Sequence, residues 1–581
     1  MKSSFLDTIK KNNTTKEGLE FLYENLALKE QSYWDEIIKN NISNWSELFT
    51  LKVKETPKKL AIIESDTDNS YTYEELEQAA TNIKNFIENN IEEYQIGLNY
   101  HNSFLFLACL LGISKANRLA ILFNNREPIH RQEELAKSSN TKIVLGNPIK
   151  GLKHFYIDEI LKEIHTPLNN SHLVFNTTLD DPAFVIFTSG TSGASKGALF
   201  SHRRMIGAGI AWSLRTGMSS EDNCYIPLPL YHGNALAVAY SSVIFSNATA
   251  TLRIKFSVSS FFEDINRFKC SHMVYIGELW RYILNRYKDN PKVANSGCET
   301  NFPVNRYLKV IFGNGLNKTL WESVVKQFKI EHVVEHFGAT EMPAGALTNW
   351  FNIAGYCGYL PPYDPKLNEM VLVDENYKSV NYGEYGEALF LVPSGKYKGY
   401  LDSSLDESKL YRELFADNDL WWKSGDLLQS HKNGFYTFIE RLGDTFRFKG
   451  ENVACVDVEE AIRKSIDIQE VVVYGITLPN IDGKIGMASL VMNKGDIKCT
   501  IQELYEKLKG QLASYAIPFF IRISPELHKT TSTLKIQKKH LANDGIKKYN
   551  KTEHFVLING EYTRVDQNLY NSILKNEIII G

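Results

Sequence analysis

The sequence predicts an α/β protein with one large N-terminal domain and one small C-terminal domain. At 581 residues the chain is too long for a single ordinary domain, and 43% hydrophobic residues, which include the 12% that are aromatic, can form a large core. Short runs of β-branched and aromatic residues alternate along the chain with segments of helical periodicity. This alternation is typical of α/β architecture.

The chain divides into three parts by composition and pattern. Residues 1–44 form a polar arm without the apolar core of a signal peptide. A large domain is expected at residues 45–440 and a small domain at residues 441–581. The boundary is placed at Glu440–Asp444, because a strand-like run at residues 434–439 is followed by a compact unit with its own helices and strands.

In the large domain, residues 104–123 are the most apolar segment and are predicted to form a buried helix followed by a strand. Polar side chains near the middle of this segment would be costly in lipid and argue against a membrane span: Ser114, Lys115, Asn117 and Arg118. Further strands are expected at residues 183–187, 198–200 and 308–312. The apolar positions of residues 321–328 lie on one helical face.

The small domain is predicted to contain a helix and three strands, at residues 457–465, 471–476, 487–492 and 519–523. A second helix is expected to begin at Thr500, because Glu503 completes a Thr-x-x-Glu capping box with it.

The charge and cysteine content restrict the partners and the compartment. A net charge of −3 argues against nucleic acid as the main partner. The seven cysteines form no CxxC pair, which suits buried, reduced thiols in a cytoplasmic protein. Lysines between residues 529 and 551 could touch a membrane surface, although a solvated basic face is the simpler interpretation.

The segment from Thr188 to Gly197 reads Thr-Ser-Gly-Thr-Ser-Gly-Ala-Ser-Lys-Gly and lies between two strand-like runs. Its glycines allow the backbone to approach an anion, and its hydroxyls and lysine supply donors and positive charge. It differs from a Walker P-loop, in which Gly-Lys-Ser/Thr opens a helix, and a flexible linker rarely joins two strands. We predict a polyphosphate-binding loop whose contacts are Thr188, Ser189, Gly190, Thr191, Ser192, Gly193 and Lys196.

This loop resembles the phosphate-binding signature of the adenylate-forming superfamily, which includes acyl-CoA synthetases, luciferases and the adenylation domains of peptide synthetases. Further motifs that resemble those of the superfamily follow in order at residues 336–341, 422–426, 440–444 and 533–536. Four segments look like the branch of very-long-chain acyl-CoA synthetases and fatty acid transport proteins: residues 275–282, 312–316, 443–453 and 524–530. The loop departs from the family pattern at Ser192, which replaces a threonine, and at Ser195, which replaces a proline.

The resemblance implies a large multi-sheet domain that forms an acyl-adenylate, and a small, mobile α/β domain that carries a hinge and a catalytic lysine. The implied reaction converts a long- or very-long-chain fatty acid, ATP and CoA into acyl-CoA, AMP and pyrophosphate, with Mg²⁺. Three alternatives stay open: a CoA ligase for another carboxylate such as a carnitine-like or aryl acid, an acyl-AMP ligase that serves a carrier protein, and an inactive protein that binds or takes up fatty acids. The sequence does not specify chain length or oligomeric state.

Catalytic roles are also implied by the resemblance. Lys535 would place positive charge between the carboxylate and the α-phosphate, which are both anionic. Glu341 would ligate Mg²⁺, because this ion prefers oxygen ligands, and Thr340 would donate its hydroxyl to phosphate. His232 matches the position next to the carboxylate being activated, and Lys196 supplies charge from the phosphate loop.

Other residues are implied to bind the nucleotide and CoA. Asp426 has two acceptor oxygens for the two ribose hydroxyls, and Arg441 could reach the same sugar. Gly450 would approach the nucleotide site in the second half-reaction, when the small domain turns about a hinge at Gly443. The purine is expected to contact two segments, which comprise Gly313, Asn314 and Gly315, and His336, Phe337 and Gly338. Phe337 would offer a flat face to adenine, with a core aromatic as the alternative.

Overall fold

The computed structural model describes residues 2–163, 176–189, 195–288, 304–343, 345–361, 370–392, 397–442, 446–448, 451–453, 455–478, 484–493, 497–528, 538–575 and 577. The chain forms two compact units. The first comprises residues 1–371, 389–424 and 430–437, and the second comprises residues 372–388, 425–429 and 438–581.

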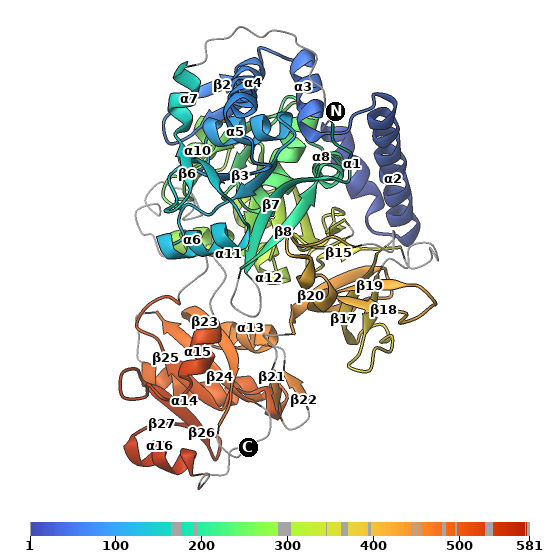
Figure 1. Ribbon diagram of the computed structural model, residues 1–581. Helices are drawn as coiled ribbons and strands as arrows, with labels where there is room; N and C mark the ends of the chain where they lie inside the picture. Colours follow the sequence, from blue (N-terminus) through green and yellow to red (C-terminus); the bar gives the residue numbers. More distant parts are fainter. Residues whose placement is uncertain are drawn as a thin grey trace. The chain divides into compact units, whose positions relative to one another are not determined.

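The first unit contains an eight-stranded sheet with the order β14-β13-β12-β11-β9-β10-β1-β2 (Figure 1). The strands from β13 to β1 pair in parallel, and β14 and β2 pair antiparallel at the two edges. The bounds are β1 Leu60–Glu64, β2 Ser70–Thr72, β9 Asn223–Ile226, β10 Thr249–Leu252, β11 His272–Ile276, β12 Val310–Asn314, β13 His332–Phe337 and β14 Leu347–Asn349. The inner strands are buried along nearly their whole length, as parallel strands covered on both faces require. The strand expected at residues 308–312 is confirmed as β12.

A six-stranded sheet of the same unit has the order β6-β5-β3-β4-β7-β8. Its bounds are β3 Gln95–Asn99, β4 Leu119–Leu122, β5 Ile143–Gly146, β6 Lys153–Phe155, β7 Pro182–Ser189 and β8 Ser195–Ser201. β7 and β8 form an antiparallel hairpin in which Thr188 pairs with Lys196. The predicted strand pair around the phosphate loop is therefore confirmed, and residues 190–194 of the loop itself lie outside the described residues.

The helices of the first unit are α1 Lys2–Asn12, α2 Lys16–Lys39, α3 Trp45–Glu55, α4 Tyr73–Asn90, α5 Phe104–Lys115, α6 Ile129–Ser138, α7 Ile157–Glu163, α8 His202–Thr216, α9 Ser241–Ser246, α10 Phe261–Arg267, α11 Gly277–Lys288 and α12 Lys318–Phe328. A π-helix, η1, spans Asn234–Tyr240. The helix and strand expected within residues 104–123 are confirmed as α5 and β4. Across the described ranges, no helix combines the length and apolarity needed to cross a membrane.

A third sheet has the order β15-β20-β19-β17-β16, and β18 pairs with β19. The bounds are β15 Gly358–Tyr359, β16 Met370–Val373, β17 Tyr385–Leu391, β18 Leu410–Arg412, β19 Leu420–Ser430 and β20 Phe435–Arg441. The strand expected at residues 434–439 is confirmed as β20.

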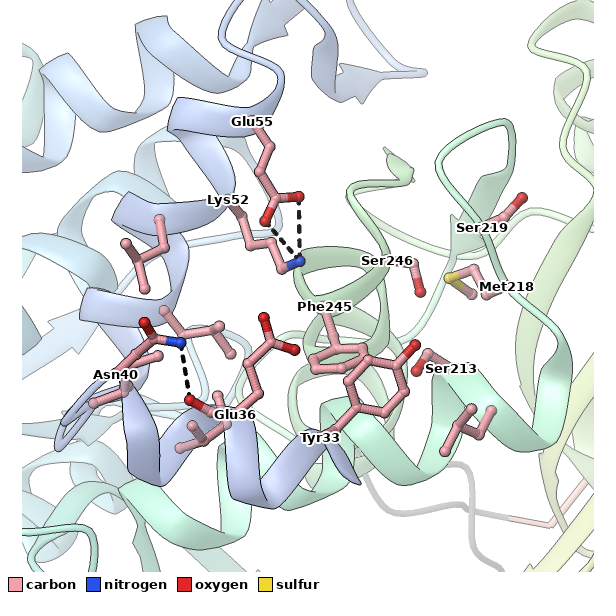
Figure 2. Close-up of a pocket in the computed structure, with 15 residues that line it drawn as sticks. Tyr33, Glu36, Asn40, Lys52, Glu55, Ser213, Met218, Ser219, Phe245 and Ser246 are labelled. Carbon is pink, nitrogen blue, oxygen red and sulfur yellow. Dashed lines mark hydrogen bonds and ion pairs between the residues drawn. The ribbon is translucent and has the colours of Figure 1, made fainter. Parts of the chain in front are cut away.

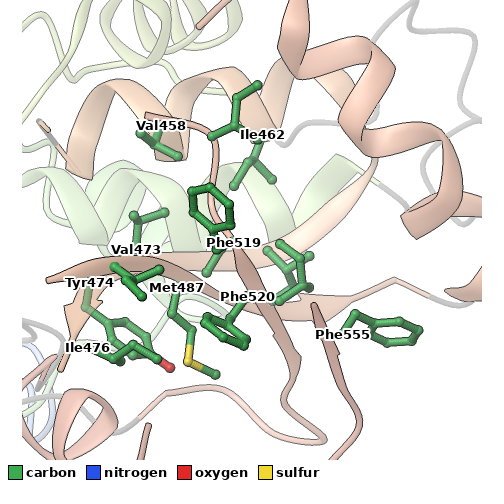
Figure 3. Packing of buried hydrophobic residues seen from close by; sticks show 14 of the residues in the cluster. Val458, Ile462, Val473, Tyr474, Ile476, Met487, Phe519, Phe520 and Phe555 are labelled. Atoms are coloured by element: carbon green, nitrogen blue, oxygen red, sulfur yellow. The ribbon is translucent and has the colours of Figure 1, made fainter. Parts of the chain in front are cut away.

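The second unit contains a five-stranded sheet, β23-β24-β25-β26-β27, and a two-stranded sheet, β21-β22. The bounds are β21 Phe446–Phe448, β22 Glu451–Val453, β23 Ile468–Ile476, β24 Ile485–Met492, β25 Phe520–Ile523, β26 His554–Ile558 and β27 Glu561–Arg564. Its helices are α13 Cys455–Ser465, α14 Ile497–Lys509, α15 Lys538–Asp544 and α16 Gln567–Leu574. Side chains of α13 and the central strands, including Ile462, Val473, Met487 and Phe520, form its apolar core (Figure 3). The predicted helix at residues 457–465 and the three predicted strands are confirmed.

The predicted helix start at Thr500 is wrong. α14 begins at Ile497, so Thr500 lies inside the helix and cannot be its N-cap. The same Thr-x-x-Glu pattern does form a capping box at the start of α4, where Thr72 and Glu75 exchange hydrogen bonds. The pattern indicates a helix start only where the backbone before the threonine leaves the helix.

Five of the seven cysteines have described side chains, and all five are buried and outside any disulfide: Cys109, Cys224, Cys270, Cys357 and Cys455. Burial raises the pKa of the Cys109 and Cys224 thiols and raises that of Cys270 to about 12. The expectation of buried, reduced thiols is confirmed for these five.

A buried ion pair joins three helices of the first unit. The ammonium of Lys115, at the end of α5, lies 2.8 Å from Glu77 Oε1 on α4 and 2.5 Å from Thr50 Oγ1 on α3. The Lys115 side chain is fully buried, and burial lowers its pKa, although Glu77 opposes this effect. Because the pair is almost fully buried, each charge depends on the other for compensation.

Replacing Lys115 by Met should leave the Glu77 carboxylate buried without a cation and reduce the free energy of unfolding by about 3–5 kcal/mol. The double variant Lys115→Met/Glu77→Leu should recover much of this loss, because an apolar pair of similar volume needs no compensation. The exposed pair Lys309–Glu331 provides the control, and Lys309→Met should cost less than about 1 kcal/mol. Urea unfolding of the four proteins measures these differences, and equal losses for the two lysine variants would contradict the prediction.

Candidate functional site

The carboxyl ends of β11, β12 and β13 meet at one edge of the eight-stranded sheet, where parallel α/β sheets commonly bind ligands. β12 runs into Gly313, Asn314 and Gly315, and Gly315 has a φ of +98°. Residues 275–277 and residues 313–315 approach each other so closely that side chains on their glycines would not fit. A Cβ on Gly277 would lie 2.0 Å from the Gly315 oxygen, and a Cβ on Gly313 would lie 2.0 Å from the Tyr275 oxygen.

A buried carboxylate, Glu335 on β13, holds this loop in place. Its Oε1 accepts hydrogen bonds from the backbone amides of Gly315 and Leu316, the latter at 3.1 Å, and its Oε2 accepts from the Tyr275 hydroxyl. Burial raises the pKa of Glu335 to about 8, against the effect of these hydrogen bonds. We did not predict a role for Glu335 from the sequence, although an acid after two valines inside an apolar run is a signal that could have been used.

The purine loop proposed at residues 313–315 lies next to two other predicted segments. Asn234 Nδ2 donates to Asn314 Oδ1 at 2.8 Å, so the loop that carries His232 adjoins the end of β12. A Cβ on Gly233 would lie 3.6 Å from Thr340 Oγ1. The structure thus brings the predicted residues Asn314 and Thr340 and the His232 loop together.

Two tyrosines bind Glu341 from one neighbouring segment. The Tyr400 hydroxyl donates to Glu341 Oε1 at 3.0 Å, and the Tyr397 hydroxyl donates to the Glu341 backbone oxygen at 2.7 Å. The Tyr400 ring also faces Lys196, whose Nζ is 5.6 Å from the ring centroid. Lys196 and Glu341, which are 145 positions apart in the sequence, therefore meet at one aromatic ring.

The segment of Tyr400 is fixed to the β7–β8 hairpin by backbone hydrogen bonds. Leu199 N donates to the Gly399 oxygen at 2.9 Å, and Leu401 N donates to the Gly197 oxygen at 2.8 Å. Burial and the nearby Glu341 carboxylate raise the pKa of Tyr400, so its hydroxyl stays protonated and able to donate. Sequence reasoning missed both tyrosines, because an isolated aromatic residue gives no signal that separates a core side chain from a site side chain.

A second cation, Arg204 on α8, lies beside the same hairpin. Its guanidinium is 4.2 Å from the centroid of the Phe200 ring and donates to the Leu199 oxygen at 3.2 Å. Burial lowers the pKa of Arg204 to about 10, and Tyr397 and Glu341 oppose this effect. Arg204 therefore remains charged at neutral pH and adds positive potential to this part of the unit.

The residues fit a Mg²⁺ ion that is shared with a phosphate. Within the described ranges, no cluster of three His, Cys, Asp or Glu side chains could hold a metal alone. Glu341 is partly exposed, and the Tyr400 hydroxyl donates to one of its two carboxylate oxygens. Magnesium is commonly held by one or two carboxylates together with substrate phosphates, which matches this single acid beside Lys196.

The His336–Gly338 segment lies at the end of β13, with two of its side chains directed into the core. His336 is buried edge-on against Trp212, with ring centroids 4.9 Å apart, and burial lowers its pKa to about 4. Phe337 is buried and stacks on Phe390 at 6.1 Å. Gly338, with no side chain, follows at the sheet edge.

In the second unit, Asp426 and Arg441 form an ion pair. Arg441 Nε lies 3.0 Å from Asp426 Oδ1, and Asp426 is almost fully buried while Arg441 is 40% exposed. Gly425, with a φ of +73°, precedes the acid, and its amide donates to Glu387 Oε1 at 3.1 Å. The backbone amide of Leu442 donates to the Gly425 oxygen at 2.9 Å, which ties the two strands together beside the pair.

The predicted residues of the phosphate loop and the small domain are only partly described. Thr188 and Ser189 belong to β7, and Thr188 Oγ1 donates to the Lys196 oxygen at 3.3 Å. The remaining predicted residues lie outside the described residues: Gly190, Thr191, Ser192, Gly193, Gly443, Gly450 and Lys535.

A cavity of about 260 Å³ is formed by α2, α3, α8 and α9 (Figure 2). Tyr33 and Phe245 pack edge-to-face across it at 4.9 Å, and Lys52 pairs with Glu55 at 3.1 Å. None of the predicted site residues lines this cavity, so it is separate from the candidate site.

The buried carboxyl of Glu335 predicts a pH-dependent stability. Its folded pKa of about 8 exceeds the ordinary value of 4.5, so the folded protein binds this proton more tightly than the unfolded chain does. The free energy of unfolding should therefore fall as pH rises from about 4.5 to about 8. Glu335→Gln cannot titrate and should show a flatter dependence. Urea unfolding across this pH window tests the difference, and parallel curves for the two proteins would refute it.

The comparisons with known proteins agree with the motifs. Residues 49–401 match the family described as AMP-binding enzyme, and residues 457–533 match the AMP-binding enzyme C-terminal domain. Medium/long-chain-fatty-acid–CoA ligase FadD6 of Mycobacterium tuberculosis is 36% identical over 456 residues, which cover 77% of this chain and 72% of FadD6. Long-chain fatty acid transport protein 1 of Bos taurus is 28% identical over 584 residues, which cover 91% of this chain and 87% of that protein.

Solved structures share the fold. O-succinylbenzoate coenzyme A synthetase (MenE) from Bacillus subtilis, in complex with ATP and magnesium ion, has a TM-score of 0.69 at 20% identity and covers 86% of this chain and 98% of its own. ATP-bound MatB from Rhodopseudomonas palustris has a TM-score of 0.72 at 19% identity and covers 87% of this chain and 99% of its own. The predicted α/β fold, with a large multi-sheet N-terminal part and a small C-terminal domain, is confirmed.

The AMP-binding match covers more than half of the residues, and the FadD6 match extends over two thirds of both proteins. The resemblance inferred from the motifs is therefore confirmed: this chain belongs to the AMP-binding enzyme family, as an AMP-forming acid–thiol ligase.

Proposed function

We propose that the chain is an ATP-dependent fatty acyl-CoA synthetase for long or very long chains that acts through an acyl-adenylate. The observation that carries this proposal is the meeting of Lys196 and Glu341 at the Tyr400 ring. This arrangement offers a cation for a phosphate and a carboxylate for Mg²⁺ at one place. The family membership and the fatty-acid ligases among the relatives support the same assignment.

In the first half-reaction, a carboxylate oxygen bonds to the α-phosphorus of ATP while the bond to pyrophosphate breaks. Lys196 would bind the negatively charged phosphates, and Glu341 and Thr340 would hold Mg²⁺ and phosphate oxygen. The ion would supply charge neutralisation along the triphosphate. Lys535 remains our proposal for the cation between carboxylate and α-phosphate, and His232 for the residue beside the carboxylate.

In the second half-reaction, the CoA thiol loses its proton to solvent, its sulfur bonds to the acyl carbon, and the bond from that carbon to the phosphate oxygen breaks, so that AMP leaves. Asp426 would accept hydrogen bonds from both ribose hydroxyls, and its ion pair with Arg441 fixes its orientation for this task. The purine would lie against residues 313–315 and the backbone of residues 336–338, because the His336 and Phe337 side chains pack into the core. Gly450 is proposed to approach the nucleotide when CoA reacts.

The identity of the carboxylic acid substrate is the more specific part of the proposal. FadD6 and the fatty acid transport proteins carry names that refer to medium- or long-chain fatty acids, which favours an apolar acyl chain here. A ligase for a carnitine-like or aryl acid, an acyl-AMP ligase and an inactive binding protein are the competing assignments. The cytoplasmic location and a peripheral contact with a membrane surface stay predictions from the sequence.

Pyrophosphate release from ATP and Mg²⁺, measured with fatty acids of graded length with and without CoA, tests the assignment. Release that needs a fatty acid and turns over repeatedly only with CoA is the expected result. A single stoichiometric burst that ignores CoA would indicate an acyl-AMP ligase. Release with an aryl or carnitine-like acid but with no fatty acid would assign the chain to another substrate class. No release with any of these acids would indicate a binding protein.

Tyr400→Phe should raise the Mg²⁺ concentration required for half-maximal activity about tenfold, because partners that orient a metal ligand typically contribute 10- to 100-fold. The variant keeps the ring that faces Lys196 and removes only the hydroxyl bonded to Glu341. Tyr94→Phe, at an exposed position, is the control and should leave the Mg²⁺ requirement unchanged. Magnesium titrations of pyrophosphate release measure the effect, and identical titrations for the two variants would exclude this role.

A further inference from the structure

The second unit contains a buried chain of three polar side chains that the proposed mechanism does not use. His528 Nδ1 lies 2.5 Å from Glu470 Oε2, and His528 Nε2 lies 2.8 Å from Ser489 Oγ. The backbone amide of His528 donates to the same Glu470 oxygen at 2.7 Å. All three residues are buried.

The two strands that hold this histidine are paired. Glu470 lies on β23 and Ser489 on β24, and the antiparallel register places Val472 opposite Ser489 and Glu470 opposite Val491. Glu470 and Ser489 are therefore diagonal neighbours on one face of the sheet, at a spacing that a single imidazole can bridge. Burial raises the pKa of Glu470, but the side-chain and backbone hydrogen bonds of His528 lower it below the ordinary value. A charged Glu470 fixes the Nδ1 proton of the ring, so Nε2 is available to Ser489.

The order of groups resembles that of a hydrolytic triad, but the position of the serine excludes that chemistry. Ser489 is fully buried in β24, between β23 and β25. An ester could not reach its hydroxyl. The three groups are instead suited to hold one point of the chain, because His528 contributes both its backbone and its ring to the same two strands.

That point of the chain is next to the segment that contains Lys535. His528 lies seven positions before Lys535 in the sequence. On the other side of that segment, Lys538 lies 3.1 Å from Glu459 Oε1 on α13, and Glu459 Oε1 also accepts from the amide of Val473 on β23. Both described ends of the segment are thus bonded to the same part of the small domain.

We propose that His528 is a positioning residue for adenylation: through Glu470 and Ser489 it fixes the point from which the chain extends to Lys535. The proposal rests on the role of Lys535 in the proposed function. It predicts a selective effect, because Lys535 serves the adenylation half-reaction and not the transfer of the acyl group to CoA. A displacement of about 1 Å at a reacting group can cost about 100-fold in rate.

The test compares the two half-reactions in the full-length protein. ATP–pyrophosphate exchange with a fatty acid measures adenylation, and acyl-CoA formation from a chemically prepared acyl-adenylate measures thioester formation. His528→Ala and Ser489→Ala should lower kcat for adenylation about 10- to 100-fold with little change in KM for ATP, and leave thioester formation within about twofold. His528→Asn can still donate to Glu470 and should recover part of the adenylation rate.

A matched control separates positioning from loss of folding. Tyr562 is buried in the same unit and donates to the Pro518 oxygen at 2.6 Å, so Tyr562→Phe removes a comparable buried hydrogen bond. This variant should change the thermal midpoint without changing the ratio of the two half-reactions. If the His528 variants lower both half-reactions together, in step with their thermal midpoints, the residue is structural and the proposal is overturned.

Lys535→Ala distinguishes the two levels of inference. If it abolishes adenylation while the His528 variants keep the wild-type ratio, the positioning role fails and the proposed function stands. If Lys535→Ala leaves adenylation intact, the assigned role of Lys535 fails, and the positioning role falls with it.

Discussion

The Glu335 side chain accepts hydrogen bonds from two backbone amides and one tyrosine hydroxyl, and much of the candidate site depends on these three bonds. Without this acceptor, the buried amide of Leu316 would have no partner at the sheet edge, at a cost of about 1–3 kcal/mol. The bonds hold residues 313–316 against β13. This places Asn314 where it meets Asn234, and the loop before Asn234 then lies against Thr340.

Buried ionisable side chains are used in two different ways in the first unit. In the Lys115–Glu77 pair, the two opposite charges compensate each other. Together with Thr50, the pair joins α3, α4 and α5 through side-chain hydrogen bonds. Glu335 has no cation among its hydrogen-bond partners and instead accepts hydrogen bonds from backbone amides. Burial therefore raises its pKa without an opposing positive charge. The first arrangement stabilises helix packing, and the second shapes a loop.

Periodicity predicted the regular elements well but not where each one begins. α12 was expected from residue 321 and begins at Lys318, because Asn317 caps it by accepting from the Leu320 amide, an interaction that an apolar pattern does not reveal. The helices α1 and α2 were not expected in the polar arm, because the few apolar side chains that α2 buries are widely spaced among charged ones. Motifs predicted Lys196, Glu341, Asp426 and Arg441 as site residues, because these charged residues lie in short segments that resemble family signatures. They did not identify Tyr397 and Tyr400, whose role exists only through the distant residues that they contact.

The five buried cysteines affect how this protein can be studied with thiol chemistry. Thiol-reactive dyes and alkylating agents attack the thiolate, and burial both blocks access and keeps these sulfurs protonated. The native protein should therefore consume little dye at these positions. In a colorimetric assay that follows the disappearance of a free thiol substrate, these five positions should add little background, and a rise in dye consumption at them would report unfolding.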